Sequence, residues 1–242
     1  MHPVICEIGP FTIYSYGLML AIAFLVSLTL ATIQAKRNNI NSDIIANLSL
    51  LVFISGIIGA RILYIIENIG YYIKNPPETI MLQHGGLSWF GGLAFGIFFG
   101  IFYLKKKNLS VYKILDLMVP YVSLGQAIGR IGCLLNGCCF GSTIIPVQIY
   151  SSLILIFIFI ILRLLQDRPH KEGEILFIYL LLYSLKRFFI EFLRADNPVI
   201  FLGLTLFQII SIVIFCLALI KLVLIKKIKG QGLRLRKRRI KP

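Results

Sequence analysis

Long apolar runs separated by short polar segments dominate the pattern of hydrophobic positions along this chain. A helix of about 20 apolar residues is long enough to cross the roughly 30 Å hydrocarbon core of a bilayer. The runs in this chain have about that length. The pattern therefore predicts an all-α polytopic membrane protein with seven transmembrane helices, at approximately residues 11–34, 46–66, 86–104, 114–134, 148–165, 174–193 and 203–225.

The loops between these helices differ in their basic residues, and the difference indicates orientation. Lys and Arg are enriched in the cytoplasmic loops of membrane proteins. Lys74 is a clear basic residue in one set of alternate loops, which is otherwise poor in positive charge. The other set contains Lys36, Arg37, Lys105, Lys106, Lys107, Arg163, Arg168 and Lys171. We therefore predict an N-terminus outside the cell and a cytoplasmic C-terminus.

Composition agrees with a membrane protein and changes the interpretation of the charge. Of the 242 residues, 58% are hydrophobic and 14% are charged, against roughly 25% charged in a soluble domain. The net charge of +15 could indicate a nucleic-acid partner in a soluble chain. Here the basic tail, residues 226–242, follows the last span, where such clusters are drawn to anionic membrane lipids. We expect residues 1–225 to form the membrane domain and no nucleic acid to bind.

Several ionisable residues fall inside the predicted spans, where charge is costly. A charged side chain at the bilayer centre costs about 2.5 to 3.5 kcal/mol on insertion scales, so such residues usually face a polar cavity or one another. Four arginines are in or at the end of a span: Arg61, Arg130, Arg187 and Arg194.

One carboxylate, Glu191, is placed to pair with these arginines. Tyr183, Arg187, Glu191 and Arg194 are spaced by four, four and three residues, which puts them on one face of a helix. A self-contained pair of Arg187 with Glu191 is one interpretation. The surplus of positive charge favours a bound anion, and arginine suits phosphate because its planar fork donates parallel hydrogen bonds. A phospholipid headgroup is the candidate.

Glycines mark a second unusual region. In Gly125–Gly132, small residues permit close helix approach, while Gln126 and Arg130 project together. Closely spaced glycines in Cys133–Gly141 favour a bent or re-entrant connection over a regular helix. A further glycine-rich stretch, Gly85–Gly92, opens the third predicted span.

The succession of these motifs resembles the bacterial phosphatidylglycerol–prolipoprotein diacylglyceryl transferases along nearly the whole chain. The most specific part is Gly125-Gln126 through Gly129-Arg130-Ile131-Gly132 to Asn136-Gly137 and Gly141, which is similar to the family signature. The other matching segments, in chain order, are His2-Pro3, Ile8-Gly9-Pro10, Tyr16-Gly17-Leu18-Met19, Gly59-Ala60-Arg61, Gly85-Gly86-Leu87-Ser88, Gly91-Gly92, Pro146 to Tyr150 and Arg187 to Arg194.

The resemblance implies an enzyme of the bacterial plasma membrane. Its substrates would be phosphatidylglycerol and the signal peptide of a prolipoprotein. The diacylglyceryl group would pass to the lipobox cysteine thiol, forming a thioether and releasing glycerol phosphate, without cofactor or metal.

The resemblance also implies roles for individual residues. Arg130 and Arg187 would bind the headgroup phosphate, and Arg61 and Arg194 would support or steer it. The remaining candidates are Glu191, which would orient Arg187; Tyr16, which would contact the lipid or align the thiol; and the signature residues Gln126, Asn136 and Gly141, which would contribute to lipid binding.

The chain departs from the family pattern at four positions. Many members have histidine at Phe90, asparagine at Cys133 and glutamate at Cys138 and Ser151. The thiolate is the nucleophile and a free cysteine has a pKa near 8.5, so a group should help remove the proton. His84 is the nearest substitute for the missing histidine, and positive potential from the arginines could instead favour the thiolate.

Two other classes of protein remain possible on the sequence. An anion or lipid transporter also uses intramembrane arginines and broken helices, but it would be expected to show inverted repeats, and the halves of this chain show no such correspondence. A non-catalytic relative that binds lipid is the second alternative, because of the substituted positions.

Overall fold

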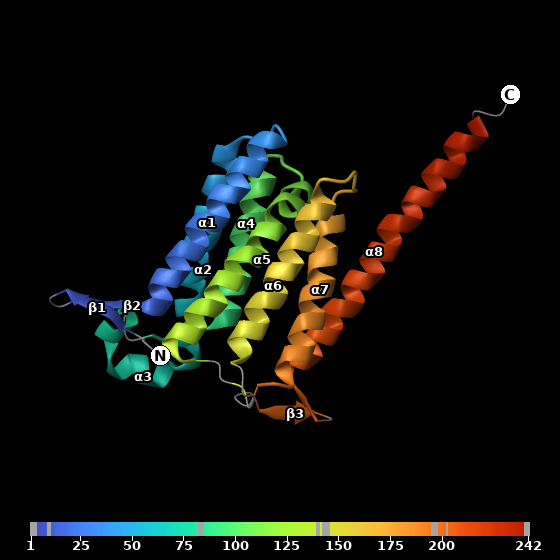
Figure 1. Cartoon of the computed structure of the whole chain (residues 1–242). Coiled ribbons are helices and arrows are strands. Elements are labelled where there is room, and N and C mark those ends of the chain that lie inside the picture. The colour runs from blue at the N-terminus through green and yellow to red at the C-terminus, as the bar shows by residue number, and fades with distance from the viewer. Residues whose placement is uncertain are drawn as a thin grey trace. The chain divides into compact units, whose positions relative to one another are not determined.

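The computed structural model describes residues 4–8, 11–81, 85–138, 141, 146–194, 198–201 and 203–239. Helices dominate this part of the chain, which confirms the predicted helical fold (Figure 1). The helices are α1 (Ser15–Arg37), α2 (Ser42–Glu67), α3 (Ile69–Lys74), the 3-10 helix η1 (Pro76–Thr79), α4 (Trp89–Lys106), α5 (Val111–Asn136), α6 (Val147–Gln166), α7 (Glu174–Glu191) and α8 (Leu206–Arg239). Two antiparallel hairpins, which the sequence did not indicate, are β1 (Val4–Ile8) with β2 (Phe11–Tyr14), and β3 (Val199–Phe201) with β4 (Leu204–Thr205).

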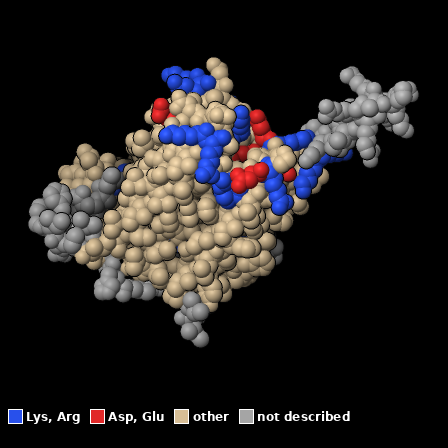
Figure 2. Space-filling view, turned by 45° about the horizontal axis from the view of Figure 1, so that its top comes forward, with Lys and Arg blue, Asp and Glu red and all other residues tan. Residues whose placement is uncertain are grey.

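Five of the described helices are long and apolar enough to cross a membrane: α1, α2, α5, α6 and the part Leu206–Lys227 of α8. The other two predicted spans fall on α4 and α7, which have 18 residues each. Many large apolar side chains are exposed, among them Phe157 at 62% and Leu217 at 59%. The face drawn in Figure 2 includes a wide area without charged residues. A surface of this kind is expected against lipid.

The chain forms two compact units. In the unit Thr32–Ile114, α2 packs on α4 through small residues. A Cβ atom added at Gly59 would lie 2.7 Å from the carbonyl oxygen of Gly91 and would also meet the side chain of Phe95. Close backbone approach of this kind is how helices associate in lipid, where the hydrophobic effect gives no driving force.

The other unit comprises Met1–Ala31 and Leu115–Pro242. Hydrogen bonds join α5 to α6, because Ser123 Oγ donates to the carbonyl of Leu155 and Ser152 Oγ to that of Ala127, both at 2.9 Å. In turn, α6 packs on α7 and α7 on α8 (Figure 1). These neighbours alternate in direction, so the end of α5, the start of α6, the end of α7 and the start of α8 lie at one end of the unit.

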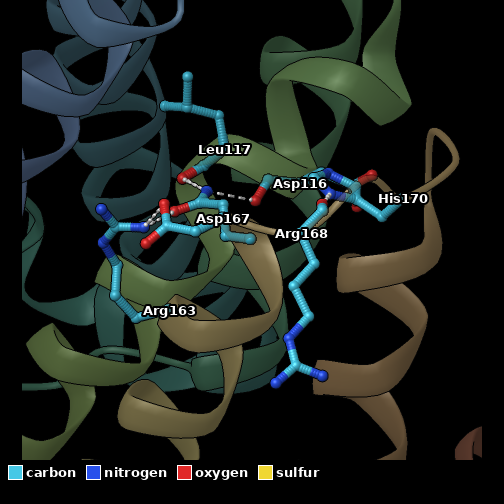
Figure 3. A network of polar contacts seen from close by, with 7 residues as sticks. Asp116, Leu117, Arg163, Asp167, Arg168 and His170 are labelled. Carbon is cyan, nitrogen blue, oxygen red and sulfur yellow. Dashed lines mark hydrogen bonds and ion pairs between the residues drawn. The ribbon is translucent and has the colours of Figure 1, made fainter.

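A polar network holds the opposite end together (Figure 3). The buried carboxylate of Asp116 accepts hydrogen bonds from the backbone N–H groups of Gly173, at 2.5 Å, and Leu176, at 2.8 Å. Gln166 Nε2 donates to the carbonyls of Asp116 and Leu117, both at 3.0 Å. The first N–H groups of a helix have no partner within the helix, so Asp116 of α5 caps α7.

Replacing Asp116 by alanine is expected to lower the free energy of unfolding by about 1 to 3 kcal/mol, because buried N–H groups at the start of α7 would lose their acceptor. Thermal unfolding in detergent measures the effect. Asp167→Ala is the matched control, since this carboxylate is exposed and its ion pair with Arg163 should contribute under about 1 kcal/mol. Equal melting temperatures for the two variants would contradict the capping role.

Candidate functional site

The C-terminal end of α7 carries a buried ion pair. Arg187 Nη2 lies 3.1 Å from Glu191 Oε2, one helical turn further on. The Glu191 side chain is inaccessible, and that of Arg187 is 12% exposed. The guanidinium group of Arg187 also lies over the ring of Phe207 on α8, 4.5 Å from its centroid. The predicted pairing of Arg187 with Glu191 is therefore present in the structure.

Glu191 also connects α7 to the start of α8. Thr205 Oγ1 donates a 3.0 Å hydrogen bond to Glu191 Oε1. The backbone N–H of Thr205 donates to Gln208 Oε1 at 2.9 Å, and the backbone N–H of Gln208 donates to Thr205 Oγ1 at 3.3 Å. This reciprocal arrangement is a capping box, which satisfies the first N–H groups of a helix. Arg187 is thus held through Glu191 by the cap of the next helix.

Four basic side chains form a cluster near this pair, defined here as the cation cluster: Arg130 of α5, Lys186 and Arg187 of α7, and Arg194 just beyond α7. The three arginines lie close enough to Lys186 to repel its ammonium group, and Arg130 and Arg194 act likewise on Arg187. Glu191 is the one carboxylate of the described residues that takes part in these interactions. Counted over the described residues, the cluster therefore has a surplus of positive charge that suits an anion.

Arg130 differs from Arg187 in its contacts. It is half-buried, and its guanidinium group makes no hydrogen bond or ion pair with the residues that the structure describes. A basic side chain that is partly removed from water normally has a partner. Arg130 therefore has donors available for a ligand.

Gly141 lies against the residues that follow α7. Its backbone forms an antiparallel bridge with Arg194, and a Cβ atom added there would collide with Val147 and with the carbonyl oxygen of Leu193. Only glycine permits this approach. The predicted irregular backbone begins at Gly137, where φ is 70°, so the prediction was wrong for residues 133–136, which continue α5.

The remaining candidates of this unit lie along α5. Gln126 Oε1 accepts a 2.9 Å hydrogen bond from Tyr179 of α7. Tyr16 is 42% exposed, and its ring lies against Gly132, two residues beyond Arg130. Asn136 is the last residue of α5 and is half-buried.

Arg61, in the other unit, is bonded to backbone. Its Nε donates to the carbonyl of Thr79, Nη1 to those of Gly85 and Gly86, and Nη2 to those of Glu78 and Met81, at 2.5 to 3.2 Å. A guanidinium group has five N–H donors, so all of them are used. Arg61 anchors residues 78–81 and 85–86, and its predicted contact with a headgroup stays a prediction.

Three residues of this site were not predicted from the sequence. Lys186 is a further ionisable residue in a predicted span, and Thr205 with Gln208 has the spacing of a capping box before an apolar run. His84, the candidate base, lies outside the described residues. Among the described residues, no group of three or more His, Cys, Asp or Glu is placed to hold a metal, and the expected lack of a metal stays a prediction.

Comparison with known proteins gives one consistent result. The sequence profile of the family described as prolipoprotein diacylglyceryl transferase matches residues 3–224. The phosphatidylglycerol–prolipoprotein diacylglyceryl transferase of Clostridium tetani is 35% identical over 216 residues, covering 81% of this chain and 86% of that protein. Proteins of the same name from Bacillus licheniformis and Streptococcus uberis are each 32% identical, covering 97% and 95% of this chain and 96% and 97% of theirs.

Proposed function

This chain belongs to the prolipoprotein diacylglyceryl transferase family, and from that premise we propose its reaction. It transfers the diacylglyceryl group of phosphatidylglycerol to the thiol of the lipobox cysteine in a prolipoprotein signal peptide. A carbon–sulfur bond forms, the carbon–oxygen bond to phosphate breaks, and glycerol phosphate leaves with the electron pair. The reaction is the first step of lipoprotein maturation.

The cation cluster carries the proposal for the site. Arg130 and Arg187 come from different helices and act on each other electrostatically, which supports a single anion between them. Both would bind the headgroup phosphate, and Arg194 would add to the field. Donors fixed in advance around a group that gains negative charge usually contribute the largest part of catalysis. Glu191 would hold Arg187 in position, and Gly141 would hold the backbone of Arg194.

We propose the predicted topology with this site. Seven spans, with α4 and α7 added to the five candidates, would place the N-terminus outside and the tail, residues 226–242, in the cytoplasm of a bacterium. The cluster would then lie toward the outer face of the plasma membrane, where secreted precursors arrive. Positive charge in alternate loops supports this orientation.

The cysteine thiol must lose its proton, and we propose two ways in which the protein would promote this deprotonation. The field of the cation cluster would favour the thiolate, and His84 is the candidate base. Tyr16 lies near α5 with its ring partly exposed, which would allow it to contact lipid or align the thiol. Gln126 and Asn136 are proposed to contact the lipid from α5.

A cell-free assay with purified protein, phosphatidylglycerol vesicles and a lipobox peptide tests the function directly. We expect a mobility shift of the peptide that depends on its cysteine and on phosphatidylglycerol. A cysteine-to-serine peptide and phosphatidylcholine vesicles are the controls. Lipid binding without modification would indicate the non-catalytic relative, and lipid movement between leaflets without modification would indicate a transporter.

Replacing Glu191 by glutamine is expected to lower both stability and transfer. Glutamine keeps the shape but leaves Arg187 without its buried charge partner, and breaking such a pair costs about 3 to 5 kcal/mol. Thermal unfolding and the peptide assay measure the two effects. Thr205→Val is the control, because it keeps the ion pair and removes two hydrogen bonds of Thr205 Oγ1, one to Glu191 and one from the Gln208 N–H, each worth about 1 kcal/mol. Full activity of Glu191→Gln would exclude the positioning role.

A further inference from the structure

Lys186 is a buried basic residue that the proposed mechanism does not yet use. It is 5% exposed. Its Nζ atom lies 5.2 Å from the centroid of the Tyr183 ring, and it makes no hydrogen bond or ion pair with any residue in the described part of the chain. Burying a basic side chain without a hydrogen-bonded or charged partner is unfavourable. This arrangement favours a ligand that compensates the buried charge.

The surroundings of Lys186 identify the charge of that ligand. Arg130, Arg187 and Arg194 all repel its ammonium group, and Glu191 is already engaged by Arg187 and Thr205. One phosphodiester carries a single negative charge, so binding it would leave the cation cluster with a surplus of positive charge. The cluster is suited to an anion of higher charge than the lipid headgroup.

The proposed reaction produces such an anion. When the thiol sulfur displaces the phosphate oxygen, the phosphodiester becomes a phosphate monoester, and the thiol proton passes to the aqueous phase. A phosphate monoester carries about −1.5 to −2 charges at pH 7. Negative charge on the phosphate therefore grows from the substrate through the transition state to the product. A group that binds the later charge more strongly accelerates the chemical step.

We propose that Lys186 is a catalytic residue that binds the departing phosphate monoester more strongly than the phosphodiester substrate. This inference rests on the proposed function, whose phosphate site it extends by one cation. It assigns to Lys186 an effect on the chemical step in addition to that of Arg130 and Arg187. The ligand class is a glycerol phosphate monoester.

The test compares Lys186→Met with the wild type in two measurements. In the transfer assay, we expect kcat to fall by about tenfold or more while KM for phosphatidylglycerol changes by less than about threefold, the pattern of an interaction made mainly in the transition state. In a thermal-shift titration without peptide, we expect the affinity for glycerol phosphate to fall by at least about tenfold. The affinity for glycerophosphoglycerol, the diester headgroup, should fall less. Lys186→Arg should retain most of both properties.

Lys227→Met is the matched control, because Lys227 is exposed on α8, and it should behave as the wild type. Equal loss of affinity for monoester and diester, or no loss of either, would overturn the proposal. So would a fall in melting temperature without a change in the monoester-to-diester ratio, which indicates a packing role alone. If the wild type binds glycerol phosphate through Lys186 but transfers no lipid, the anion site stands and the proposed function fails.

Discussion

Arg130→Ala is expected to reduce diacylglyceryl transfer by about 100-fold or more, the usual cost of removing one donor from a preorganised anion site. Arg130 makes no bond to the described residues, so its removal should leave the melting temperature nearly unchanged. The peptide mobility assay measures transfer, and thermal unfolding in detergent measures stability. A large loss of activity without a loss of stability would mark a residue whose partner is the substrate.

Arg187→Ala should abolish transfer to a similar extent and should also destabilise the protein, because it leaves Glu191 buried and unpaired. Arg187→Lys separates charge from geometry, since lysine keeps the charge but not the planar fork. Arg168→Ala is the matched control for both arginines, because Arg168 is exposed in the loop before the start of α7 (Figure 3), whereas Arg187 lies near the end of that helix. Full transfer by both alanine variants would exclude the phosphate-binding role.

The helices could be predicted from the sequence because their signal is local. Each predicted span falls mostly on a helix, although the starts of two spans are strands, at residues 11–14 and 204–205. The spacing of Arg187 and Glu191 correctly indicated a contact one turn apart. The hairpins β1–β2 and β3–β4 are too short for a periodic pattern to stand out. Glycines misled the prediction in residues 133–136, where the continuing hydrogen bonds of α5 outweigh the weak helix propensity of nearby glycine.

The site was less predictable, because the use of a charged side chain depends on partners far away in sequence. Arg61 and Arg130 both interrupt apolar spans and are equivalent on the sequence alone. In the structure, the partners of Arg61 are backbone carbonyls 17 to 25 residues further along the chain. Every residue has a backbone carbonyl, so the residue types in a sequence do not indicate which carbonyls will accept these bonds. Likewise, Asp116 caps a helix that begins 58 residues later, which is invisible to a search for local capping residues.

Arg61→Ala is expected to lower the free energy of unfolding by at least about 3 kcal/mol, because five hydrogen bonds from one buried charged group are lost together. Arg61→Lys should be nearly as damaging, since an ammonium group has three donors and cannot reach all five carbonyls. Thermal unfolding measures the global effect. Limited proteolysis between η1 and α4 measures whether the segment anchored by Arg61 opens.

Lys74→Ala supplies the control for the same unit, because this exposed residue ends α3 and should leave both measurements unchanged. The decisive comparison is between stability and the KM for phosphatidylglycerol. If Arg61 acts as an anchor, Arg61→Lys should make the segment between η1 and α4 sensitive to protease in the absence of lipid. If Arg61→Lys instead keeps the melting temperature and the protease resistance of the wild type and raises only the KM, Arg61 contacts the headgroup. In that case, the hydrogen bonds from Arg61 to the five carbonyls do not contribute measurably to stability.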